Sequence, residues 1–134
     1  MKTLLTVAVC LLYLLPGNDL FAQAITIEMM PPVVIQSTPQ SGAINVDPST
    51  TELRVTFSKD MKTDSWSCLQ FSKESWPGLS PRGFTKDQRT FVANVKLQPG
   101  KTYVVEINDE DHKNFKDASE RSAMPYMIVF RTHY

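Results

Sequence analysis

One short acidic segment contains the residues best suited to chemistry in this sequence. Residues 108–112 read Asn-Asp-Glu-Asp-His and place three carboxylates and an imidazole within five positions. Carboxylate oxygens are ligands for calcium, and a histidine beside a carboxylate can contribute to a copper or zinc site. Asp109, Asp111 and His112 are therefore candidate metal ligands. The alternative interpretation is a solvated polar loop at the end of a strand, and because we favour it we expect no cofactor.

Aromatic side chains form a second candidate site, because exposed rings on a β-domain can stack against sugars. Trp66, Trp76 and Tyr126 are the candidates for binding an envelope glycan in this way. However, Trp66 begins a strand-like run and Trp76 precedes a Pro-Gly turn. Packing of one tryptophan in the core and of the other against proline explains both residues at least as well.

The residues needed for catalysis or for nucleic-acid binding are missing. The five glycines are scattered singly, and no Gly-x-Ser-x-Gly motif occurs. A Ser-His-Asp set is conceivable solely through His112. The 14 basic and 14 acidic residues cancel, whereas a nucleic-acid binder normally carries a basic surplus. We predict a protein that is not an enzyme and that does not bind nucleic acid.

Short β-type runs separated by turn residues dominate the sequence after residue 32. The runs are residues 33–38, 52–58, 67–71, 89–97, 102–108 and 126–132. In the second run, Leu53, Val55 and Phe57 alternate with polar residues, so one face is buried and the other wet. This pattern predicts an all-β fold, an antiparallel sandwich, with at most one short helical turn in each of 59–65 and 111–121.

The N-terminus has the pattern of a secretory signal. Lys2 precedes an apolar run over residues 4–15, and Ala22-Gln23-Ala24 is a small-x-small cleavage site. The run is shorter than the roughly 20 residues of a membrane-spanning helix, so no membrane span is expected after cleavage. We therefore predict a signal peptide over 1–24 and a protein exported to the periplasm, cell surface or extracellular space.

The exported part divides into a leader and one domain. Residues 25–32 show no sustained period and are expected to be loosely ordered. Residues 33–134 have the length of a single domain. Cys68 is the one cysteine left after cleavage, so no intrachain disulfide can form, and its strand-like surroundings favour a small buried hydrophobe over pairing between molecules.

A structural motif joins two of the predicted strands. Residues 97–103 place a leucine, the turn residues Pro99 and Gly100, and Tyr103 at the spacing of a tyrosine corner. In that arrangement a buried phenol bonds the backbone of the loop above it. We expect the Tyr103 hydroxyl to satisfy a backbone carbonyl there, a role in stability rather than activity.

Four segments in this order resemble the bacterial Ig-like domain family of SbsA type. They are residues 37–46, residues 53–61, the 97–103 corner and the terminal Val-Phe-Arg-Thr of residues 129–132. Asp60 stands where that family often has proline, and 118–123 lacks the glycine usual before the last strand. The resemblance implies an immunoglobulin-like sandwich of about seven strands, a spacer or accessory module of secreted and cell-surface bacterial proteins, with no catalytic residues.

A second resemblance concerns the acidic segment. Small periplasmic copper carriers of the CopC type share the domain size and an acidic-histidine loop in a comparable place. They also use a histidine at the mature N-terminus, where this chain is expected to begin with Ile25. The sequence thus predicts a non-enzymatic module that contacts a protein partner or the cell envelope, with CopC-like metal binding or carbohydrate binding as alternatives.

Overall fold

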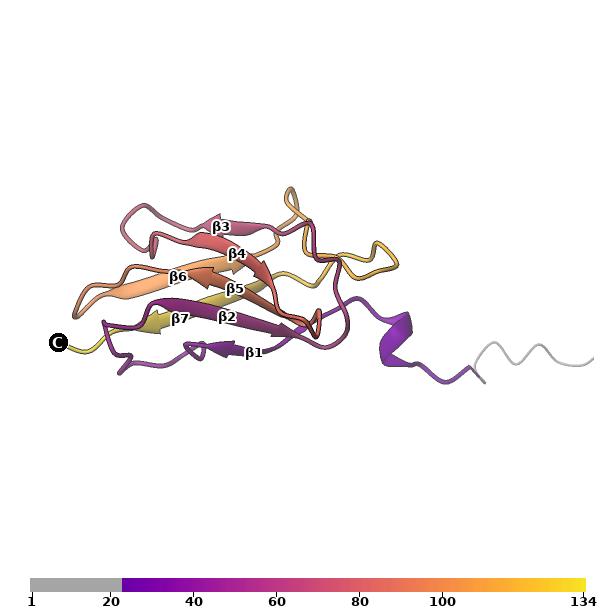
Figure 1. Cartoon of the computed structure of the whole chain (residues 1–134), viewed down its shortest axis with the longest axis horizontal. Coiled ribbons are helices and arrows are strands. Elements are labelled where there is room, and N and C mark those ends of the chain that lie inside the picture. Colours follow the sequence, from indigo (N-terminus) through magenta and orange to yellow (C-terminus); the bar gives the residue numbers. More distant parts are fainter. Residues whose placement is uncertain (1–22) are drawn as a thin grey trace, which may run out of the picture.

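The computed structural model describes residues 23–134, so the predicted signal lies outside the described residues except for Gln23 and Ala24. Seven strands and one short 3-10 turn make up its regular structure (Figure 1). These are η1 (Ile27–Met29), β1 (Val34–Thr38), β2 (Glu52–Phe57), β3 (Cys68–Gln70), β4 (Ser80–Phe84), β5 (Thr90–Asn94), β6 (Thr102–Ile107) and β7 (Tyr126–Arg131).

The strands form two sheets in which every pairing between named strands is antiparallel. One sheet has the order β1-β2-β5-β4 and the other the order β3-β6-β7. Four strands against three in this order is the arrangement of a seven-stranded immunoglobulin-type sandwich. The predicted fold class is therefore confirmed.

Side-chain alternation builds the core as the sequence predicts. Leu53, Val55 and Phe57 on β2 are fully buried, and Phe91 and Ala93 on the neighbouring β5 are equally buried. The other sheet contributes its own inward face to the same cluster, through Tyr103, Val105, Ile107, Ile128 and Phe130. Rings from the two sheets and the connecting loops pack within about 5–6 Å of one another, as aromatic pairs prefer.

One strand was not predicted. β4 reads Ser-Pro-Arg-Gly-Phe, a composition that disfavours strands, and it pairs with β5 through a bulge between Pro81 and Gly83. It lies at the edge of its sheet, where a proline does not interrupt an inner ladder. Neither 59–65 nor 111–121 contains a helical turn. Both are irregular segments joined by an isolated bridge between Met61 and Asp117.

The chain enters and leaves the sandwich at opposite ends. The leader and η1 approach the end where β2 finishes, whereas the C-terminus lies at the far end (Figure 1). Residues 42–46 cover the free edge of β7 in parallel fashion, with the Gly42 amide donating to Val129 and the Arg131 amide to Ala43. Within residues 23–134, no helix has the length and apolar character needed to cross a membrane.

Candidate functional site

The acidic loop after β6 uses its own carboxylate as an internal acceptor. Asp109 Oδ1 accepts hydrogen bonds from the Asp111 and His112 amides, at 2.9 and 2.6 Å, and lies 3.0 Å from His112 Nδ1. Partial burial raises the pKa of Asp109, but these hydrogen bonds outweigh it and hold the pKa below its ordinary value.

This loop brings only two of its three predicted ligands together through their side chains. Asp109 and His112 meet, whereas Asp111 contributes its backbone amide. In the part of the chain that the structure describes, no three histidine, cysteine, aspartate or glutamate side chains converge as they would around a metal ion. The geometry is that of a loop closed by its first aspartate.

The aromatic candidates come from three separate segments. Trp66 precedes β3 and packs its ring 5.3 Å from that of Phe91, and Trp76 packs partly buried against the core from the loop between β3 and β4. Tyr126 begins β7, with 37% of its surface exposed. A hollow of 210 Å³ beside Tyr126 includes Asp109 but neither tryptophan, so it does not gather the three rings.

The tyrosine corner is present, with one difference in its hydrogen bond. Tyr103 is 1% exposed, and its Oη accepts from the Gln98 amide at 2.7 Å, so the expectation of a carbonyl partner was wrong. The Gln98 carbonyl is instead satisfied by the Thr132 hydroxyl at 2.5 Å. Gly100 in the turn has a φ of +64°, the left-handed region that favours glycine.

Asn108 organises the long loop before β7, a role that sequence reasoning missed. Its side chain is buried and lies next to the candidate Asp109. Asn108 Nδ2 donates to the carbonyls of Phe115 and Ala123, at 3.0 and 3.1 Å, while its Oδ1 accepts from the Phe115 amide at 3.0 Å. Its φ of +55° suits asparagine, which enters the left-handed region more readily than most residues.

The leader is attached to the sandwich through a cation, so its predicted loose ordering has a specific contact to set against it. Lys59 Nζ lies within 3.0 Å of the Glu28 and Met30 carbonyls, and it also forms an ion pair of 2.7 Å with Asp117 Oδ2. The Arg121 guanidinium donates to the Glu28 carbonyl as well. Backbone bonds continue the attachment, from Met124 to the Pro32 carbonyl and from Ser58 to the Val33 carbonyl.

Asp117 is the buried anion of this cluster, with a side chain only 1% exposed. Burial raises its pKa, but Lys59 and the amides of Arg121 and Ser119 outweigh that effect and leave the pKa below its ordinary value. The neighbouring Glu120 has a φ of +66° within 118–123, the segment in which the resembled family usually has glycine. An exposed glutamate paired with Lys62 occupies the left-handed position here.

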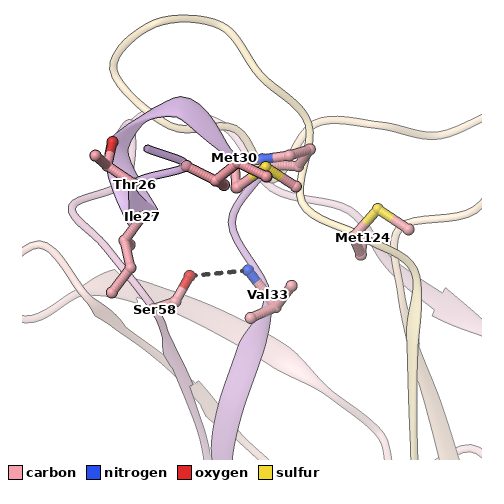
Figure 2. A pocket seen from close by; sticks show the side chains of 8 residues that line it. Thr26, Ile27, Met30, Val33, Ser58 and Met124 are labelled. Atoms are coloured by element: carbon pink, nitrogen blue, oxygen red, sulfur yellow. Dashed lines mark hydrogen bonds between the residues drawn. The ribbon is translucent and has the colours of Figure 1, made fainter. Parts of the chain in front are cut away.

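An open apolar groove of 560 Å³ lies between the leader and the end of the sandwich (Figure 2). Its lining residues are Ile25, Thr26, Ile27, Met30, Pro31, Val33, Ser58 and Met124. The leader therefore supplies one wall, and the β1 and β2 ends with Met124 supply the other. Ile25, Ile27 and Met124 each remain more than half exposed.

Cys68 behaves as the small hydrophobe expected from its surroundings. It starts β3, is partly buried against the core, and is free. Burial raises the pKa of its thiol to about 12. A thiol with so little thiolate at neutral pH is a poor nucleophile.

Two antiparallel sheets in this strand order, with a tyrosine at the start of β6, define an immunoglobulin-like domain. The sequence profile of the family described as bacterial Ig-like domain matches residues 28–132, so the chain belongs to that family. No curated protein sequence matches it.

Solved structures of similar fold include domains of the S-layer protein SbsC and the protein CopC. The N-terminal part of the bacterial S-layer protein SbsC aligns with a TM-score of 0.51 at 20% identity, over 79% of this chain and 24% of that chain. A longer SbsC structure gives 0.50 at 21% identity, over 79% and 14%. CopC from Methylosinus trichosporium OB3b gives 0.51 at 13% identity, over 76% of this chain and 93% of CopC. At such identities the likeness shows the fold, and this chain spans less than a quarter of the SbsC chains.

Proposed function

We propose that this protein is an exported, non-enzymatic immunoglobulin-like module that acts through contacts with another protein or with the cell envelope. Membership of residues 28–132 in the bacterial Ig-like family carries the proposal. The signal predicted over 1–24 supports export to the periplasm, the cell surface or the extracellular space.

The use of the charged residues supports a non-enzymatic role. Asp109 closes its own loop, Asp117 neutralises Lys59, and Glu120 pairs with Lys62. Each of these carboxylates has a lowered pKa because a local partner stabilises its charged form. A general acid or base would instead need a pKa near the working pH. These groups therefore serve loop structure.

The edge strands of the two sheets determine whether such a module can bind a partner by strand addition. β4 carries Pro81 and a bulge, β3 has three residues, and residues 42–46 cover β7. These three edges are protected against pairing with another strand, and β1 is the fourth edge of the two sheets. We therefore expect contacts through side chains on the faces and loops, with β1 as the edge at which strand addition would occur.

Sedimentation with envelope preparations tests the proposal. The exported protein, labelled and titrated onto washed envelopes of the producing cells, is expected to bind saturably and to be displaced by unlabelled protein. A parallel titration on protease-treated envelopes separates a protein partner, whose binding is lost, from an envelope polymer, whose binding survives. Binding that never saturates would refute the proposal.

The two alternatives have tests of their own. Equilibrium dialysis against copper and against calcium, with His112→Ala as the matched variant, would establish metal binding only if stoichiometric retention depended on His112. Titration with envelope polysaccharides would establish sugar binding if tryptophan fluorescence changed and Trp76→Phe removed the change. We expect neither response, because Asp109 Oδ1 already accepts a hydrogen bond from the His112 amide of its own loop and the tryptophans pack on the core.

A further inference from the structure

The attachment of the leader differs in kind from the attachment of the strands. Residues 23–30 are exposed, and η1 buries none of its residues. The apolar core therefore contributes little to holding η1. What holds it is a set of hydrogen bonds from two cations to backbone carbonyls.

Lys59 is the centre of this set. Its side chain extends from the segment just after β2, is only 13% exposed, and ends among the carbonyls of Ile27, Glu28 and Met30. An ammonium group has three donors and can satisfy several acceptors at once. Two of these carbonyls belong to η1, and the third belongs to Met30, its extended C-cap residue. Asp117 on the opposite side supplies the counter-charge.

The position of the leader adds a geometric consequence. It approaches the sandwich at the end opposite the C-terminus (Figure 1). A leader free to swing would leave the groove at that end without the wall formed by Ile25, Ile27 and Met30. A leader held by Lys59 keeps this wall of the 560 Å³ groove in place.

We infer that residues 25–32 are a rigid leader held by Lys59, which keeps one wall of the groove in place and which can be released without unfolding the sandwich. The release is local because the hydrogen bonds that break belong to Lys59 and not to a strand ladder. It ends at Pro32 and Val33, whose carbonyls accept from Met124 and Ser58. Release also removes the leader wall of the groove. This inference is independent of the proposed function.

The test replaces Lys59 and its counter-ion together. Lys59→Met keeps most of the aliphatic stem, and Asp117→Asn avoids a buried unpaired charge while preserving the Oδ1 acceptor for the Ser119 and Arg121 amides. The matched control is Lys62→Met with Glu120→Gln, which removes a neighbouring ion pair that does not touch the leader. Backbone ¹⁵N relaxation of the protein as the cell exports it reports ordering at Thr26 to Met30, since Pro31 and Pro32 lack an amide hydrogen.

In the unaltered protein we expect order parameters of about 0.8 or higher at these amides, close to those of the strands. In the Lys59→Met, Asp117→Asn variant they should fall below about 0.6, while β2, β5 and β6 stay unchanged. The Lys62→Met, Glu120→Gln control should match the unaltered protein. The Arg121 amide and the Asn108 side-chain amide serve as internal checks that the loop before β7 is intact.

Three results would overturn the inference. The first is a leader that is already flexible in the unaltered protein, a measurement that needs no variant to fold. The second is a leader that stays equally ordered without Lys59. The third is loss of order in the strands together with the leader, because attachment would then be part of the global fold.

Discussion

Replacement of Asn108 by alanine should destabilise this domain more than any loss of a single hydrogen bond. The change removes three buried hydrogen bonds, to the Phe115 amide, the Phe115 carbonyl and the Ala123 carbonyl. At about 1 kcal/mol each, these contribute about 3 kcal/mol to the free energy of unfolding. Placing alanine at a φ of +55° adds about 1 kcal/mol. The expected loss is therefore about 4 kcal/mol, a large share of the 5–15 kcal/mol typical of a domain.

Urea denaturation with linear extrapolation measures this loss. Asn108→Gly removes the same hydrogen bonds without the backbone strain, so it should cost about 1 kcal/mol less than Asn108→Ala. Asn114→Ala, at an exposed position of the same loop, is the matched control and should change the free energy of unfolding by less than about 0.5 kcal/mol. The reasoning fails if Asn108→Ala falls within 1 kcal/mol of the unaltered protein, or if alanine and glycine are equivalent.

Three further predictions use other groups of the structure. Tyr103→Phe should lower the melting temperature by about 4 °C through loss of the Gln98 hydrogen bond, at about 1 kcal/mol, whereas Tyr126→Phe should leave it unchanged. The thiol pKa of Cys68 is raised to about 12, so we expect this thiol to react slowly with an aromatic disulfide at pH 8. Its reaction rate in the folded protein should be at least about 100-fold lower than its rate in urea. Equal rates would contradict the burial of Cys68. Asp117 has a lowered pKa in the folded protein, so its contribution to stability is present above its ordinary pKa and is lost as the pH falls through the folded value. Between about pH 5 and pH 2 the free energy of unfolding of the unaltered protein should therefore fall more than that of Asp117→Asn. Parallel curves of unfolding free energy against pH would refute this.

The core was predictable because its signal is local. The alternation of Leu53, Val55 and Phe57 can be recognised from neighbouring residues alone. The turn at Pro99-Gly100, followed by Tyr103, likewise predicts the tyrosine corner from a few consecutive positions. β4 was not predictable in the same way, since its composition disfavours strands and its conformation comes from pairing with β5. A strand that forms because a neighbouring strand pairs with it shows little strand propensity in its own residues.

The candidate sites were harder to predict because the role of each residue depends on contacts with residues far away in the sequence. The acidic segment was correctly recognised as polar and loop-like, yet the residue that organises the region is Asn108, which has no periodicity or charge to mark it. Lys59 and Asp117 are 58 positions apart, and neither residue type indicates that the other lies 2.7 Å away. The attachment of the leader to Lys59 depends on residues outside 25–32, so that segment alone could not predict it.

One physical distinction connects these observations. The strands are held by an apolar core shared between two sheets, whereas the leader end of the sandwich is held by buried polar groups: Asn108 for the loop before β7, Asp117 for the 118–121 turn, and Lys59 for the leader. Burial of apolar surface is non-directional, but each of these polar contacts fixes one geometry. The leader end should therefore be the part of the domain whose shape is most sensitive to single substitutions and to acid, while the opposite end, with the tyrosine corner, retains the fold.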